Sequence, residues 1–285
     1  MIRAFALALV ALLAVVPGCK KAEAVHIAYS QLFAAGDQLL LVGSVPDELT
    51  GYRELNRIAL VGTDGAVRKS VDERNAFHVA GVTSDVVWLS RGTAPPGLEA
   101  RALDTLAPQP GIADALKGHD ALAATYDVIG IQDGRAVLDG PDGKRYSVDR
   151  SGAIAPLAGD AEVRPKPSKR VPARDETVLG TDPPSVLVFG SDFQGGAPVE
   201  TLSREDANGT TAWTTAVTEL AAPVGIDEAK VSLVGTARLG ESVWLVTRAS
   251  RTTRRDQQDY YEVEHRLVRL DPATGRATES HLIQN

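Results

Sequence analysis

The sequence predicts an all-β protein, and three observations support that prediction. Strand-like segments recur from residue 26 to residue 283, either alternating between apolar and polar positions or forming short apolar runs. The 26 glycines and 16 prolines suit a chain with many turns. The segments fall into sets that repeat at roughly 45–55 residues, a spacing typical of propeller blades. We therefore expect a single β-propeller-like domain of about five four-stranded antiparallel blades, within the usual four to eight.

The five sets follow one another along the chain, and each begins with two apolar strands and continues with a more polar outer hairpin. The predicted strands are 27–33, 39–45, 57–61 and 66–71; then 77–82, 86–90 and 98–103; then 126–131, 135–138, 145–148 and 153–157; then 177–179, 185–189, 199–202 and 211–215; and finally 231–236, 242–247, 260–270 and 276–283. The apolar run 39–42 is expected in a strand that neighbouring sheets cover on both faces. Residues 108–125 are predicted to form a loop between blades.

The last hairpin shows how the outer turns are built. Asp271 can bond its own backbone, Pro272 presets φ near −65°, and Gly275 can adopt the positive φ that closes such a turn. An aspartate stands near the tip of the corresponding hairpin in several other sets. The chain is therefore predicted to be a series of related sheets that close into a ring and so protect their edges.

Two of these hairpins carry a recognisable motif. Leu-Asp-x-x-Thr-Gly closes a strand at 270–275, and Asp-x-x-Gly-x-x-x-Trp spans 206–213. Both resemble the outer hairpins of PQQ-type and related β-propeller repeats. The residues that carry the resemblance are Asp271, Thr274, Gly275, Asp206, Gly209 and Trp213. The resemblance implies that Trp213 packs between blades. It implies no activity, because propellers host many unrelated functions, and no acidic, calcium-binding set for a PQQ cofactor is evident.

The N-terminus resembles a bacterial lipoprotein signal. Arg3 precedes an unbroken apolar run at 4–16, which is shorter than the roughly 20 residues a spanning helix needs. The run ends at Gly18-Cys19, and Cys19 is the only cysteine of the chain. The resemblance implies that Cys19 is acylated and becomes the first residue, and Lys20 after it implies sorting to the outer membrane. An ordinary secretory signal followed by an accidental cysteine is the alternative.

These predictions divide the chain into three parts: a signal peptide at 1–18, the lipidated cysteine with a short tether at 19–25, and the propeller-like domain at 26–285. The formal net charge of the whole chain is −7. Removal of 1–18 takes away only Arg3 among the charged residues, leaving 29 basic and 37 acidic residues and a net charge of −8. An acidic body argues against nucleic-acid binding, which needs a basic face. We expect a membrane contact through the N-terminal lipid anchor.

Two basic stretches are expected on the surface. Residues 164–174 alternate prolines with lysines and arginines, which favours an extended, solvated linker, with docking on anionic lipid headgroups as the alternative. A second group is predicted to occupy a long hairpin loop in the last blade, where it can form a lip that faces a partner. This group consists of Arg251, Arg254, Arg255, Asp256 and Asp259.

No catalytic motif is found. Gly-x-Ser-x-Gly, His-Glu-x-x-His and Gly-x-x-x-x-Gly-Lys are all missing from the sequence, and its five histidines have no metal-ligand spacing. Asp139, Asp142 and Asp149 lie close together, but Asp-Gly hairpin turns explain them better than a calcium site does. No cofactor is therefore expected.

The sequence favours a non-catalytic envelope lipoprotein that presents its propeller surface to a protein or small-ligand partner. The alternative is a glycan-active hydrolase or lyase with acidic residues in the funnel of the propeller. An aromatic content of 5% argues against a sugar-binding cleft. A sensor or structural spacer is a third possibility.

Overall fold

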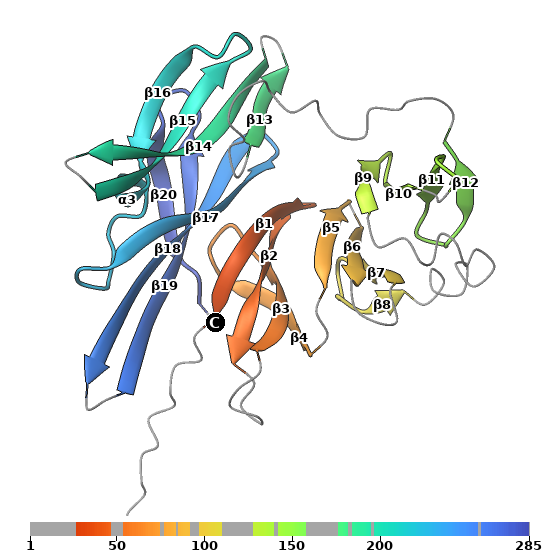
Figure 1. Ribbon diagram of the computed structural model, residues 1–285, viewed down its shortest axis with the longest axis horizontal. Helices are drawn as coiled ribbons and strands as arrows, with labels where there is room; N and C mark the ends of the chain where they lie inside the picture. Colours follow the sequence, from red (N-terminus) through yellow and green to blue (C-terminus); the bar gives the residue numbers. More distant parts are fainter. Residues whose placement is uncertain are drawn as a thin grey trace, which may run out of the picture.

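The computed structural model describes residues 27–46, 54–74, 77–83, 85–91, 97–109, 128–139, 142–157, 176–181, 184–194, 197–255 and 258–284. Within these ranges the strands form five four-stranded sheets, each an antiparallel meander in which consecutive strands are hydrogen-bonded neighbours (Figure 1). The predicted all-β class and the predicted five four-stranded antiparallel sheets are therefore confirmed.

The sheets are numbered here by their order in the chain. Sheet 1 comprises β1 (Ala28–Ala35), β2 (Gln38–Pro46), β3 (Glu54–Val61) and β4 (Val67–Glu73); sheet 2, β5 (His78–Val82), β6 (Val86–Arg91), β7 (Gly97–Ala102) and β8 (Pro108–Gln109); sheet 3, β9 (Val128–Gln132), β10 (Arg135–Asp139), β11 (Arg145–Val148) and β12 (Ile154–Pro156); sheet 4, β13 (Glu176–Thr181), β14 (Pro184–Gln194), β15 (Ala197–Asp206) and β16 (Thr211–Ala216); sheet 5, β17 (Lys230–Leu239), β18 (Ser242–Arg255), β19 (Gln258–Asp271) and β20 (Arg276–Leu282). A one-turn helix, α3 (Val217–Leu220), follows β16. No helix in the described ranges has the length and apolar character to cross a membrane.

Two sequence predictions need correction. The expected loop at 108–125 begins with strand β8, which pairs with β7 and completes sheet 2. The expected loop at the end of sheet 5 is a two-stranded ribbon, because β18 continues to Arg255 and β19 begins at Gln258. Arg251 pairs with Glu262 across this ribbon. Thr252 and Thr253 pair with Tyr261 and Tyr260 across the ribbon, and both residue types favour strands, so charge alone was a misleading indicator of a loop.

The sheets are arranged in an arc whose order is 3-2-1-5-4 (Figure 1). At each junction the first strands of the two sheets approach each other: β9 contacts β5, β5 contacts β1, β1 contacts β17, and β17 contacts β13. The chain therefore brings its first and last sheets together. Sheets 3 and 4 lie at the two ends of the arc, and their described strands are not in extensive contact. The predicted closed ring is thus open between these two sheets.

Each junction is filled by one hydrophobic cluster, and the second strand of a central sheet serves two of them. In β2, Leu39 and Leu41 pack toward sheet 5, whereas Leu40 and Val42 pack toward sheet 2. In β6, Val87 and Leu89 likewise face sheet 1, whereas Val86 and Trp88 face sheet 3. All of these side chains are buried, and the run 39–42 is covered on both faces as the sequence predicts. The apolar runs therefore mark sheets held between two neighbours.

A β-bulge recurs in the first strand of all five sheets. The extra residues are Ser30, Ala80, Ile129, Leu179 and Val234. In sheets 2 to 5 the residue directly after the extra one is a glycine. Taking this next residue in each of the five sheets gives positions 31, 81, 130, 180 and 235, which are 50, 49, 50 and 55 residues apart. The bulge is an internal repeat that increases the local twist of each first strand.

The glycines after the bulges allow close packing between first strands. A Cβ added at Gly235 would lie 3.2 Å from the Cβ of Leu32 in β1, and one added at Gly81 would overlap the side chain of Ile131 in β9. Any larger residue at these positions would force the first strands of adjacent sheets apart.

Polar contacts supplement the apolar junctions. Arg101 of β7, only 3% exposed, binds Glu99 at 2.7 Å and the carbonyl of Leu106 at 3.0 Å, and it also pairs with Glu73 of sheet 1. On the other side of sheet 1, the amide of Gln284 donates to the carbonyl of Gly65 at 3.3 Å. These contacts join sheet 1 to sheet 2 and to the C-terminal end of the chain.

Candidate functional site

A cavity of about 270 Å³ lies where sheets 1, 2 and 5 meet, and we call it the Arg248 pocket. Its walls come from the start of β1, the second half of β2, the start of β3, the entry to β5 and the middle of β18. It is lined by Ala28, Tyr29, Ser30, Gln31, Val42, Gly43, Ser44, Asn56, Phe77, His78 and Arg248. The bulge at Ser30 and the close approach of Gly43 to the backbone of Ala28 make part of the wall main chain rather than side chain.

The charge of the Arg248 pocket is one-sided. Arg248 is the only arginine or lysine among the lining residues, and no aspartate or glutamate lines the pocket. The remaining polar groups are neutral hydroxyls and amides together with His78, and the apolar part of the wall includes Tyr29 and Phe77. A pocket with one fixed cation, neutral hydrogen-bonding groups and aromatic surface is suited to binding a small molecule.

Arg248 and His265 occupy adjacent strands at paired positions, so their side chains lie on the same face of sheet 5. His265 is 4% exposed, and its ring meets that of Tyr29 edge to face with 5.1 Å between centroids. Burial, with a smaller effect from the nearby charge of Arg248, lowers the pKa of His265 to about 4. His265 is therefore neutral at pH 7, and Arg248 carries the positive charge of this face.

Two nitrogens of this face are buried without a hydrogen-bond acceptor or donor in the described structure: Arg248 Nε and His265 Nε2. Buried polar atoms are paired in most proteins, and leaving one unpaired is unfavourable. Both atoms belong to side chains at the same junction of sheets 1 and 5. The junction thus holds more hydrogen-bonding capacity than the fold itself uses.

A second set of contacts orients the opposite wall. Arg57 of β3 forms two hydrogen bonds with Asp72 of β4, at 2.6 and 2.7 Å, and also donates to the Tyr29 hydroxyl. Burial raises the pKa of Tyr29, although the Arg57 charge opposes this shift. Tyr29 therefore remains a protonated phenol at neutral pH. The Asp72–Arg57 pair fixes the ring that lies against His265.

The two motif hairpins identified in the sequence lie against each other at the junction of sheets 4 and 5. Trp213 of β16 donates from Nε1 to the carbonyl of Pro272 at 3.0 Å, and Thr215 donates to the carbonyl of Gly275 at 2.9 Å. A Cβ added at Gly275, where φ is +72°, would lie 2.5 Å from the Trp213 ring. This ring therefore rests directly on the backbone of the neighbouring turn.

The aspartates of these hairpins organise their own turns. Asp206 Oδ1 accepts from the amides of Asn208 and Thr210 at 2.9 and 2.8 Å, and Gly209 adopts a φ of +80°. Asp271 accepts from the amide of Ala273 at 2.9 Å and from the Thr274 hydroxyl at 2.7 Å. These hydrogen bonds hold the pKa of each aspartate below its usual value. The six motif residues therefore build turns and a sheet junction, with no ligand-directed arrangement.

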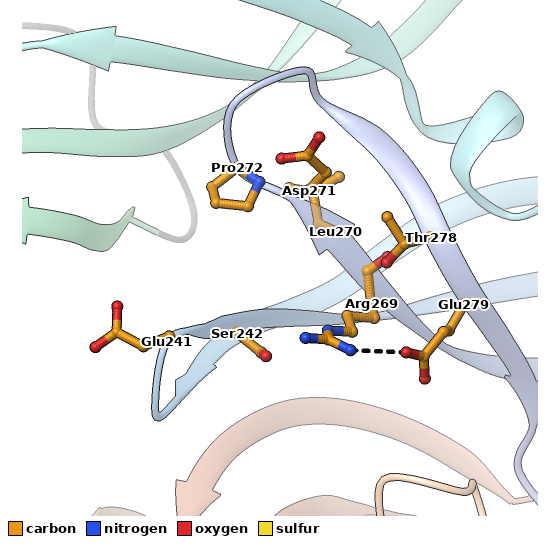
Figure 2. Close-up of a pocket in the computed structure, with 8 residues that line it drawn as sticks. All are labelled: Glu241, Ser242, Arg269, Leu270, Asp271, Pro272, Thr278 and Glu279. Atoms are coloured by element: carbon orange, nitrogen blue, oxygen red, sulfur yellow. Dashed lines mark hydrogen bonds and ion pairs between the residues drawn. The ribbon is translucent and has the colours of Figure 1, made fainter.

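A shallower cleft of about 340 Å³ opens on the outer side of sheet 5, between the turn after β17 and strands β19 and β20 (Figure 2). Its central feature is the pair formed by Arg269 Nη1 and Glu279 Oε1 at 2.7 Å. Their side chains are 43% and 42% exposed. The hydrogen bond from Arg269 lowers the pKa of Glu279, so both groups are charged and already satisfy each other. The cleft therefore offers little unpaired charge to a ligand.

We expect Arg269→Ala to lower the free energy of unfolding by less than about 1 kcal/mol, because solvent screens an exposed ion pair. The measurement is urea unfolding of the wild type, both single variants and the Arg269→Ala/Glu279→Ala double variant. The four values form a thermodynamic cycle for the pair. A coupling energy well above 1 kcal/mol would contradict the view that this pair is an exposed, weak contact.

A cavity of about 460 Å³, larger than the two described above, is lined by residues of sheets 1 and 2 and by Arg150. Asp37, Asp85 and Asp104 line it, but Arg150 of sheet 3 also reaches into it and pairs with Asp85. We call it the acidic cleft. Like the cleft around Arg269 and Glu279, it gathers three carboxylates, and Arg150 already pairs with one of them.

The other sequence predictions are placed as follows. Cys19, the tether and the basic stretch 164–174 lie outside the described residues. No group of three or more histidines, cysteines, aspartates or glutamates suited to a metal ion occurs among the residues that the structure describes. Asp142 instead accepts from the Tyr146 hydroxyl at 2.8 Å, and Asp149 Oδ1 accepts from the amide of Ser151 at 2.9 Å.

The sequence analysis missed the residues of the Arg248 pocket. Arg248 stands between a threonine and an alanine in a strand, and Tyr29 begins another strand 219 positions earlier. One signal was available in the sequence: Arg248 follows the apolar strand that begins at Val243, and it has the same alternation as the inward-facing residues of that strand. A charged side chain on a buried face is uncommon, which makes the residue a candidate for a functional role.

The chain was compared with protein-family models and with curated proteins. No family model matches it, and no curated protein shows significant similarity to its sequence.

Proposed function

We propose that this protein is a non-catalytic binding protein of the bacterial cell envelope, anchored through lipid on Cys19. The observation that carries the binding role is the Arg248 pocket. It combines one cation with neutral polar groups and aromatic surface, and it has no carboxylate among its lining residues. A glycosidase needs two carboxylates on either side of the bond it cleaves, so this pocket suits binding better than glycan cleavage.

We further propose that the five sheets form a single propeller-like domain. Three features support this arrangement: the cyclic order of neighbouring sheets, the approach of first strands at each junction, and the bulge that recurs in every first strand. Small-angle X-ray scattering tests the proposal. A compact domain of this length has a radius of gyration of about 18 Å. A clearly larger value would argue against a single compact domain and for sheets that are strung out separately.

The anchor is tested by membrane fractionation of wild-type cells and of cells that express Cys19→Ala at the same level. We expect the wild-type chain in the membrane pellet and the variant in the soluble fraction, because two or three acyl chains anchor a protein stably. Detergent should release the wild type, while high salt should not. Equal distribution of the two chains would disprove lipid anchoring and would leave the pocket unaffected.

The alternative function, a glycan-active hydrolase or lyase, is favoured by the three aspartates of the acidic cleft, the larger of the two described clefts that carboxylates line. The test is incubation of the full chain with labelled envelope glycans, beside an Asp37→Asn/Asp104→Asn double variant. We expect no cleavage by either protein. Cleavage by the wild type that the double variant loses would replace the binding function with the catalytic one.

A further inference from the structure

The Arg248 pocket differs in charge from the chain that forms it. The whole chain carries a net charge of −7, yet an arginine lines this pocket and no aspartate or glutamate does. Asp72, the acidic group linked to its wall, is already held by two hydrogen bonds from Arg57. An anion that entered the pocket would therefore meet one guanidinium and no lining carboxylate.

The guanidinium is positioned to accept such a partner. Arg248 is held in the backbone ladder between Ser232 of β17 and His265 of β19, so its strand cannot shift without breaking sheet 5. Its Nε is buried and has no acceptor within the described structure, so an anion in the pocket would be held by the two terminal nitrogens of the guanidinium. A planar guanidinium binds the two oxygens of a carboxylate through parallel hydrogen bonds. His265 lies beside it as a neutral ring and adds no competing charge.

The remaining walls define the body of the ligand. The volume of about 270 Å³ lies below the range of drug-sized pockets, which restricts the ligand to a small molecule. Tyr29, Phe77 and Val42 supply apolar surface, whereas Ser44 and Asn56 supply neutral hydrogen-bonding groups. A bare inorganic ion would leave the apolar surface unused. An organic acid with a small apolar or aromatic body uses both kinds of wall.

We propose that the Arg248 pocket binds a small organic carboxylate, with its carboxylate on Arg248 and its body between Tyr29 and Phe77. This proposal rests on the binding function above and specifies its ligand class. The ligand would contact sheets 1, 2 and 5 together, because the pocket lies at their junction. Binding therefore stabilises the junction and raises the unfolding temperature.

The test uses the full chain in detergent and a panel of small carboxylates that includes benzoate and succinate. Each acid is matched by its neutral primary amide, and inorganic phosphate is a separate arm. Thermal unfolding and calorimetric titration are measured for every compound. We expect at least one carboxylate to raise the unfolding temperature in a saturable way, while its amide and phosphate have little effect.

Three variants locate the site. Arg248→Gln should weaken binding about 10- to 100-fold, the loss expected for a charge-assisted hydrogen-bonded pair. Arg269→Gln is the matched control, since it removes an exposed arginine of the same sheet, and it should bind like the wild type. Ser44→Leu should block binding by filling the pocket from β2 while Arg248 remains in place. The unliganded unfolding temperature of each variant shows whether it has folded.

The outcomes separate the ligand class from the binding function. Amides that bind as tightly as their acids, in a manner that Ser44→Leu blocks, would disprove the carboxylate assignment and retain a binding pocket. If inorganic phosphate binds as tightly as the acids, the ligand does not need an organic body and that part of the proposal is wrong. If no carboxylate of the panel shifts the unfolding temperature, or if Arg248→Gln binds as the wild type does, the proposal is wrong. Membrane fractionation of Cys19→Ala is independent of all these results.

Discussion

Gly275→Ala is expected to lower the free energy of unfolding by about 2–5 kcal/mol. Two effects add at this position. Gly275 has a φ of +72°, a conformation that costs an L-residue with a Cβ about 1–2 kcal/mol. The new Cβ would also lie 2.5 Å from the Trp213 ring, far inside van der Waals contact. The ring cannot easily move aside, because its Nε1 is hydrogen-bonded to Pro272. Urea unfolding of the variant measures the loss.

Gly134→Ala is the matched control. Gly134 also turns a hairpin with a positive φ, of +74°, but a Cβ added there would meet nothing within 4 Å. It should therefore show the conformational cost alone, about 1–2 kcal/mol. In a Trp213→Ala background, Gly275→Ala should cost less than in the wild type, because the ring has been removed and only Thr215 Oγ1, 2.9 Å from the new Cβ, still obstructs it. Equal losses for the two glycine variants in the wild-type background would contradict direct packing of Trp213 on the turn.

The turns of this protein could be predicted from sequence because their chemistry is local. An aspartate that binds the amides two and four residues later needs no partner from elsewhere in the chain. Asp206 and Asp149 both do this, and a glycine with positive φ follows three residues after each. The same local rules separate the strands, so the number of sheets and their antiparallel pairing follow from the sequence as well.

The apolar runs in the sequence predict which sheets have a neighbouring sheet on both faces. Four consecutive buried residues in β2 require cover on both faces, and the structure supplies it from sheets 5 and 2. The arrangement of sheets was harder to predict, because it depends on contacts between first strands that lie about 50 residues apart or, for β1 and β17, at opposite ends of the chain. The glycine after the bulge in sheets 2 to 5 is the sequence feature that corresponds to these contacts. Its spacing of about 50 residues can be interpreted only once the bulges are known from the structure.

The candidate site could not be predicted from sequence for the same reason. The Arg248 pocket combines residues of three sheets, and no two of its polar side chains from different sheets are close in the sequence. The long hairpin of sheet 5 shows the limit of composition-based arguments. Its arginines and acids suggested a loop, yet cross-strand pairing of Arg251 with Glu262 makes the same charges compatible with a strand.

The stability of the protein should fall by about 3 kcal/mol between pH 6.5 and pH 4 because of His265 alone. Burial lowers the pKa of this residue from 6.5 to about 4 in the folded chain. In this window the unfolded chain binds a proton that the folded chain does not. The contribution is therefore fully present above pH 6.5 and is lost progressively as the pH falls to about 4.

His265→Gln isolates this contribution. The variant keeps a polar side chain at the same position but cannot be protonated, and every other titratable group is the same in the two proteins. The difference between the two urea-unfolding curves should therefore change by about 3 kcal/mol across the window. The groups that face His265 are Tyr29, a protonated phenol here, and Arg248, which is positively charged. Neither carries a negative charge that would offset protonation of this buried ring, so parallel pH curves for the two proteins would contradict the lowered pKa of His265.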